Sequence, residues 1–186
     1  MFQFDRRFVR HWSERYVAEE MGDGVERRLL RVVGPTAAVS GYLTSTDLQE
    51  IGRWKAVRAT GYLARNKAQD IEDVTALALD PHTPERMRHW VLRYLQGIGN
   101  PVASAILTVW QPKRHTILDY RALEALQELQ RLQVLGSAAP EGSQGSLPGY
   151  WTYLGLYRPV ANRLGVSYRN LDRALWKWHK SAMPTR

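Results

Sequence analysis

Two glycines one residue apart are the most informative feature of this sequence. Gly97 and Gly99 lie between two apolar helical patterns, and the second pattern begins at once with small residues such as Ala103. Glycine permits a positive φ and lets another backbone come close, and the first amides of a helix have no partner inside it. Such amides bind phosphate. An ordinary helix hairpin with a glycine turn is the alternative interpretation.

One acid stands out beyond the second helical pattern. Asp119 lies twenty positions after Gly99, follows the uncharged residues Thr116, Ile117 and Leu118, and opens the next helical pattern. Acids at the start of a helix are common caps, so Asp119 taken alone does not define a site.

The segment 95–119 resembles the helix-hairpin-helix DNA glycosylases, the superfamily of endonuclease III, the adenine-mismatch glycosylase and 8-oxoguanine glycosylase. Gly97 and Gly99 match the leucine-x-glycine-hydrophobic-glycine hairpin with which that family grips the DNA backbone. The approach Ile117-Leu118-Asp119 is similar to the adenine-mismatch branch, and the family's aspartate stands beside the flipped nucleotide. The resemblance is tight over this segment and loose over the rest of the chain.

The resemblance implies cleavage of an N-glycosidic bond. That reaction places positive charge on the deoxyribose, which a carboxylate such as Asp119 stabilises while it activates the attacking water. The nucleotide must first leave the duplex, at a cost of a few kcal/mol.

Strand-cutting members of the family use a lysine two residues after the second hairpin glycine, or in the helix before the hairpin. This chain has Pro101 at the first place and Trp90 near the second, so we expect a monofunctional glycosylase in which water attacks the sugar. Lys55 is a second catalytic candidate, with a solvated lysine as the alternative. Tyr120-Arg121-Ala122 replaces the family's usual residues after the aspartate.

Further site residues are expected to contact DNA or the extruded base. Candidates for DNA binding are Gly97, Ile98, Gly99, Asn100, Val102, Ala103, Lys113, Arg114, Arg58 and Tyr120. Candidates for the base pocket are Trp54, Asn66 and Trp176, for which core packing or helix capping is the alternative.

Helical periodicity must supply the frame that positions these residues. Apolar residues at three- and four-residue steps predict helices over 4–20, 48–54, 58–65, 70–79, 83–95, 102–110, 120–135, 150–165 and 167–179. The stretch 29–33 fits a strand or a helix, and Gly34-Pro35 is expected to end it. We therefore predict an all-α fold of two helical lobes with a cleft between them. One lobe pairs the chain ends, 1–40 and 137–186, and the other, 41–136, holds the hairpin.

Composition limits the partners and cofactors. The 186 residues contain 26 basic and 18 acidic side chains, a net charge of +8 that favours a polyanion, and we expect double-stranded DNA. No cysteine is present, which excludes a cysteine-held iron–sulfur cluster, and the histidines lack metal-ligand spacing, so we expect no cofactor and no metal. No apolar run suits a membrane span or a signal peptide, so a cytoplasmic monomer is expected.

Two other classes of function stay open from the sequence. A non-catalytic module would keep the hairpin as a phosphate clamp and release no base from any substrate, with strongly salt-dependent DNA binding. A helical scaffold for a protein partner would not bind duplex DNA even at low salt.

Overall fold

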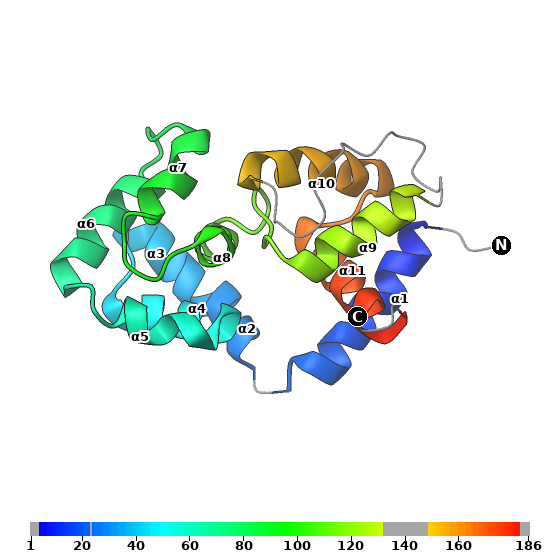
Figure 1. Cartoon of the computed structure of the whole chain (residues 1–186), viewed down its shortest axis with the longest axis horizontal. Coiled ribbons are helices and arrows are strands. Elements are labelled where there is room, and N and C mark those ends of the chain that lie inside the picture. Colours follow the sequence, from blue (N-terminus) through cyan, green and yellow to red (C-terminus); the bar gives the residue numbers. More distant parts are fainter. Residues whose placement is uncertain (1–3, 23, 132–148, 183–186) are drawn as a thin grey trace. The chain divides into compact units, whose positions relative to one another are not determined.

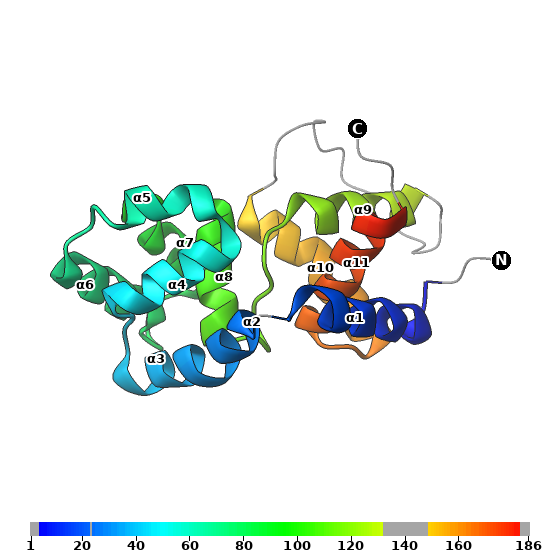
Figure 2. The same ribbon diagram turned by 90° about the horizontal axis from the view of Figure 1, so that it is seen from below.

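The chain folds into helices. The structure is a computed structural model that describes residues 4–22, 24–131 and 149–182, and every regular element in these ranges is a helix, which confirms the predicted all-α class (Figure 1, Figure 2). Residues 132–135, the end of the helix predicted over 120–135, lie outside the described residues.

Two compact units divide the chain. One comprises 1–22 and 116–186, here called unit 1, and the other comprises 23–115, here called unit 2. The sequence had placed the boundaries at 40 and 136 instead. They fall earlier because the helices over 25–40 pack within unit 2, whereas the helix over 120–131 packs within unit 1.

Unit 1 is built around its last helix. It contains α1 (Arg6–Glu20), α9 (Tyr120–Arg131), α10 (Tyr150–Leu164) and α11 (Tyr168–Ala182). α11 packs on the other three and lies between α1 and α9 in both views (Figure 1, Figure 2). Tyr153 and Tyr157 of α10 are fully buried and form part of its core. Ion pairs from Lys177 to Glu19 and Glu20 join α11 to the end of α1.

Unit 2 surrounds one buried helix. Its elements are α2 (Val25–Arg28), η1 (Leu29–Val33), α3 (Gly34–Ser40), α4 (Ser45–Lys55), η2 (Val57–Ala59), α5 (Thr60–Leu63), α6 (Ala68–Leu79), α7 (Glu85–Leu92) and α8 (Asn100–Trp110). α8 contacts η1, α3, α4 and α7, and every one of its residues from 102 to 110 is buried. A capping box starts α4, where the Thr44 and Asp47 side chains each bond the other's backbone N–H.

The helix that begins at Val25 does not end at Gly34-Pro35, contrary to the prediction. η1 is a π-helical turn, and the chain continues from it through α3 to Ser40. A proline inside a helical run removes one hydrogen bond and crowds the turn before it, and the π-helical turn that directly precedes α3 is the irregularity next to Pro35. Gly34 is required for packing, since a Cβ at this position would overlap the carbonyl oxygen of Val109 in α8.

Candidate functional site

The turn between α7 and α8, residues 93–99, holds both glycines. Gly97 has φ +80°, and a Cβ on it would lie 2.9 Å from Tyr62 Cβ, 3.0 Å from Leu63 N and 3.1 Å from Ala59 O. Both the conformation and the close approach of α5 therefore require glycine. Gly99 differs, because its φ of −88° and ψ of −178° are ordinary extended values and only Pro101 Cδ, at 3.8 Å, would meet a Cβ.

Asn66 fastens this turn to the end of α5. Its Nδ2 donates to Gln96 O at 3.0 Å and to Leu63 O at 3.0 Å, while its Oδ1 accepts from Gln96 N at 2.8 Å. Both polar ends of the side chain are thus engaged with backbone. The structure gives Asn66 a positioning role, whereas the sequence had placed it in the base pocket.

The start of α8 presents amides without a capping side chain. Gly99 is the N-cap and makes no side-chain cap, and the Ala103 N–H donates to Gly99 O at 3.0 Å. Since Pro101 has no N–H, the helical geometry leaves the amides of Gly99, Asn100 and Val102 outside the hydrogen-bond ladder. Ala103 was predicted to bind DNA, but its N–H is already engaged within the helix.

Apolar side chains behind these amides belong to the core. Ile98, Val102 and Ala103 are buried, so their side chains are not available to a ligand. His89 of α7 is buried as well, with Nε2 3.4 Å from Asn100 O. Burial lowers the pKa of His89 to about 4, so the ring that supports the start of α8 is neutral at pH 7.

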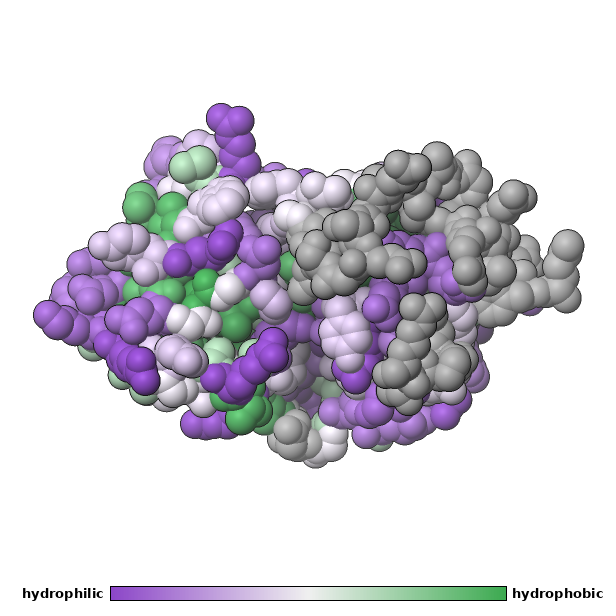
Figure 3. All heavy atoms as spheres, viewed as in Figure 1, coloured by the Kyte–Doolittle hydropathy of each residue, from purple (hydrophilic) through white to green (hydrophobic). Residues whose placement is uncertain are grey.

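Charge in unit 2 is separated along the chain. Residues 53–69 and 86–115 each contain five basic side chains and no acid, whereas all nine acids of unit 2 lie elsewhere. Gly97 packs against Ala59 and Tyr62, which brings these two acid-free segments together. The turn is therefore bordered by cationic segments, and the view of unit 2 in Figure 3 shows hydrophilic side chains beside apolar ones.

Sequence reasoning found only part of this cationic set. Arg58, Lys113 and Arg114 were predicted and are exposed, and Arg114 lies 3.7 Å from Glu85. The exposed residues Arg53, Arg65, Lys67 and Arg93 were missed. The absence of acids over 53–69 and 86–115 is the signal that would have found them.

Asp119, in unit 1, caps α9. Its Oδ1 accepts from Arg121 N at 3.0 Å and its carbonyl oxygen accepts from Leu123 N at 3.0 Å. The residue is half-buried, whereas Leu118 before it is fully buried. The structural alternative raised by the sequence, a helix cap, is thus a real role of Asp119, and the bond fixes one carboxylate oxygen in position.

Two buried tyrosines of α10 interact with Asp119. The rings of Tyr153 and Tyr157 have centroids 5.1 Å apart, and neither hydroxyl has a hydrogen-bond partner of ordinary geometry among the described residues. Burial, and after it the charge of Asp119, raises the pKa of Tyr153 well above 10.0. Burial likewise raises the pKa of Tyr157. Both phenols therefore keep their protons at neutral pH and carry no charge.

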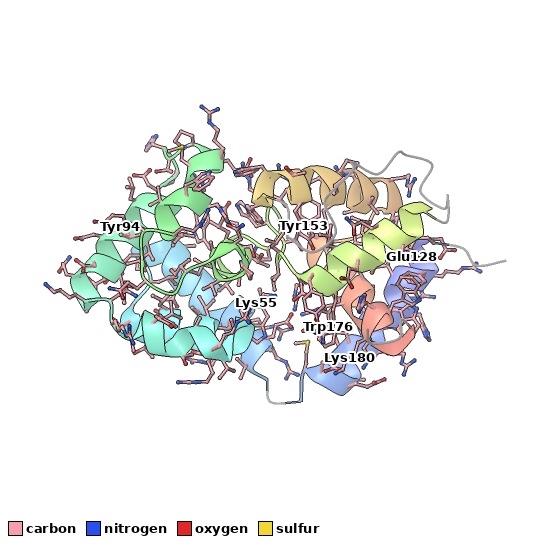
Figure 4. The ribbon with its side chains drawn as sticks, viewed as in Figure 1. Lys55, Tyr94, Glu128, Tyr153, Trp176 and Lys180 are labelled. Atoms are coloured by element: carbon pink, nitrogen blue, oxygen red, sulfur yellow. The ribbon has the colours of Figure 1, made fainter. Side chains whose placement is uncertain are left out.

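Aromatic candidates fall in both units. Trp54 and Lys55 are half-buried at the end of α4 in unit 2, where Figure 4 labels Lys55. Trp176 of α11, in unit 1, is half-buried with Lys180 Nζ 5.0 Å from its ring centroid (Figure 4). Tyr120 is 47% exposed beside Asp119. Of the base-pocket candidates, Trp54 and Asn66 thus lie in unit 2 and Trp176 lies in unit 1.

The Trp176 ring is in contact with several neighbouring side chains. The Arg121 guanidinium lies 5.3 Å from its ring centroid, and the Tyr16 ring meets it edge-on at 5.5 Å. These contacts tie α1, α9 and α11 together. Packing therefore accounts for much of this side chain's surroundings.

Comparisons of the chain with family models, with curated proteins and with solved structures found no match. The family resemblance therefore rests on the residues of the turn and of the segment leading to Asp119. Among the described residues, no cluster of three or more histidine or acidic side chains is suited to hold a metal ion, and no helix is long and apolar enough to cross a bilayer.

Proposed function

We propose that this protein is a monofunctional helix-hairpin-helix DNA glycosylase that hydrolyses the N-glycosidic bond of a damaged or modified base extruded from double-stranded DNA. The observation that carries the proposal is the turn at Gly97, where φ is +80° and no Cβ fits. This turn holds the uncapped start of α8 between two acid-free basic segments. Backbone amides and surrounding cations are what a DNA phosphate requires.

In the proposed reaction the bond between C1′ and the base nitrogen breaks, and its electron pair leaves with the base. Asp119 stabilises the positive charge that develops on the sugar and takes a proton from the water that attacks C1′. The bond from Arg121 N to Oδ1 orients the carboxylate for this task. The neutral phenols of Tyr153 and Tyr157 add no charge of their own beside this carboxylate.

Two lysines of unit 1, Lys177 and Lys180, are poorly suited to attack the sugar as amines. Burial lowers the pKa of Lys177, but its hydrogen bonds to Glu19 and Glu20 outweigh that effect and raise the pKa above 10.5. Lys180 donates to Glu20 at 2.9 Å. A charged, paired ammonium is a poor nucleophile. Lys55 is the lysine to test because the sequence analysis puts it forward as a second catalytic candidate.

A single-turnover assay tests the enzyme directly. Duplex oligonucleotides that each carry one damaged, mismatched or modified base are incubated with the parent chain and with Asp119→Asn, and base release is measured. We expect release from at least one duplex and loss of at least about 100-fold in rate for Asp119→Asn. Release at the parent rate by Asp119→Asn contradicts the role of this carboxylate. Borohydride trapping of a covalent adduct would contradict the monofunctional mechanism, and Lys55→Ala would then identify the amine.

A non-catalytic DNA-binding module is the second candidate. The observation that favours it is the α9 cap, since the bond from Arg121 N to Asp119 explains this acid without any chemistry. This candidate predicts duplex binding that weakens steeply with salt and no base release from the whole panel.

A further inference from the structure

We propose that the outer face of α7 and of the chain that follows it is a stacking platform for the bases of an unpaired DNA strand. The platform consists of Trp90 and Tyr94, flanked by Met87 and Arg93. This platform is distinct from the proposed contact between the turn and duplex DNA. The inference rests on the proposed function only for the choice of DNA as the partner.

The first argument is exposure. Trp90 is 59% exposed, Tyr94 is 83% exposed and Met87 is 45% exposed. Met87 and Trp90 lie one turn apart on α7, and Tyr94 follows in the turn after α7, where its N–H donates to Val91 O at 3.0 Å. Large aromatic rings at such exposure contribute little to the core, and contiguous ones mark a binding surface. Figure 4 labels Tyr94 on unit 2.

The second argument is the charge around the rings. The Arg93 guanidinium lies 4.7 Å from the Trp90 ring centroid, and no acid occurs between residues 86 and 115. An acidic peptide would find the same charge, but planar rings beside guanidinium groups are suited above all to nucleobases, which present a flat face and a phosphate at each step. Charge and ring geometry together therefore select a nucleic acid strand over a protein segment.

The third argument is continuity with the turn. Tyr94 is three residues before Gly97, so their Cα atoms are at most about 11 Å apart. On the other side of Gly97, Tyr62 is 54% exposed and carries the Arg65 guanidinium 4.9 Å from its ring centroid. Two ring-and-arginine pairs thus border the same turn. A strand whose phosphate lies on the turn could place neighbouring unpaired bases on these rings.

The experiment compares two single-stranded ligands with equal charge. One is a fluorescently labelled oligodeoxythymidylate, and the other is the same sugar-phosphate chain with tetrahydrofuran abasic units instead of nucleotides. Fluorescence anisotropy gives the Kd of each ligand for the full chain and for Trp90→Ala, Tyr94→Ala and Tyr94→Phe. Leu77→Ala is the matched control, since Leu77 is a 57% exposed apolar residue of unit 2 outside the platform.

We expect the parent chain to bind the thymidylate strand more tightly than the abasic strand. Trp90→Ala and Tyr94→Ala each weaken thymidylate binding by roughly 5-fold or more, because stacking on one ring contributes on that order. Tyr94→Phe, which keeps a ring, and Leu77→Ala bind like the parent chain. All variants bind the abasic strand equally.

Three results would overturn the inference. Equal affinity of the parent for both strands, or no loss in the two alanine variants, removes stacking as the source of binding while leaving duplex binding by the turn intact. Self-association that disappears in Trp90→Ala, with strand binding unchanged, assigns the face to a protein contact. Failure to bind either strand or duplex DNA at low salt overturns the proposed function as well.

Discussion

Alanine at the two glycines of the α7–α8 turn is expected to separate folding from DNA binding. Gly97→Ala forces a residue with a Cβ to φ +80° and against backbone atoms of α5 and η2, namely Leu63 N at 3.0 Å and Ala59 O at 3.1 Å. The left-handed conformation costs about 1–2 kcal/mol, and the overpacking costs about 1–3 kcal/mol. Alanine also restricts the unfolded chain more than glycine does, which reduces the loss of unfolding free energy by about 0.4–1 kcal/mol. The expected net loss of unfolding free energy is about 3 kcal/mol.

Gly99→Ala is the matched control on the folding side. Its φ of −88° and ψ of −178° suit alanine, and the nearest atom to its Cβ would be Pro101 Cδ at 3.8 Å. The unfolding free energy should therefore stay within about 1 kcal/mol of the parent value. If the amides at the start of α8 hold a phosphate, the added methyl group stands in its way. A hydrogen bond to a charged group contributes roughly 1.5–3 kcal/mol, so duplex affinity should fall about tenfold or more.

Urea unfolding followed by circular dichroism measures the first effect, and fluorescence anisotropy with a labelled duplex measures the second. Two results would refute the reasoning. A Gly97→Ala chain as stable as the parent shows that the turn can shift at no cost. A Gly99→Ala chain that binds duplex DNA as tightly as the parent shows that the start of α8 does not contact phosphate.

Three further predictions concern single side chains. Asp119→Asn keeps an oxygen acceptor for the α9 cap, so its urea midpoint should match the parent, whereas Asp119→Ala should lose about 1 kcal/mol. Since the pKa of His89 is about 4 in the folded chain and about 6.5 when unfolded, the unfolded state binds a proton first as the pH falls. Unfolding free energies measured between pH 7 and pH 4 should decrease by about 3 kcal/mol through this residue, and His89→Gln should remove that decrease. The Tyr150 hydroxyl donates to Thr116 O at 3.3 Å, so Tyr150→Phe should lose about 1 kcal/mol in urea unfolding, whereas Tyr153→Phe should lose none.

The helices themselves could be predicted from the sequence, because their signals are local. Apolar spacing located α1, α4, α6, α8 and α10, and in the structure the side chains of Thr44 and Ser167 accept hydrogen bonds from the first turns of α4 and α11. Gly34-Pro35 misled because a glycine-proline pair usually ends a helix. Here the glycine serves the crossing of α3 over α8 at Val109, a contact 75 positions away that no local pattern contains.

The site was harder to predict, since its geometry depends on contacts that are distant in sequence. Gly97 was found as a turn residue, but the reason that alanine is excluded lies in Tyr62 and Leu63. Asn66 was predicted as a base-pocket residue or a helix cap, and its bond to Gln96, thirty positions further on, is a contact that no local pattern contains. Asp119 could be placed at a helix start, and its cap on α9 follows from that position.

The arrangement of charge says more about the partner than the net charge does. Each unit has thirteen basic and nine acidic residues, so the total of +8 divides equally between them. In unit 1 the two signs are paired, as between Lys177 and Glu20 and between Arg169 and Asp172. In unit 2 ten of the thirteen basic residues occupy two segments without acids, which Gly97 joins. Pairing cancels the field at a distance, whereas separation focuses it on one surface. The two acid-free segments and the uncapped start of α8 thus belong to the same unit, which is what the proposed contact with a polyanion requires.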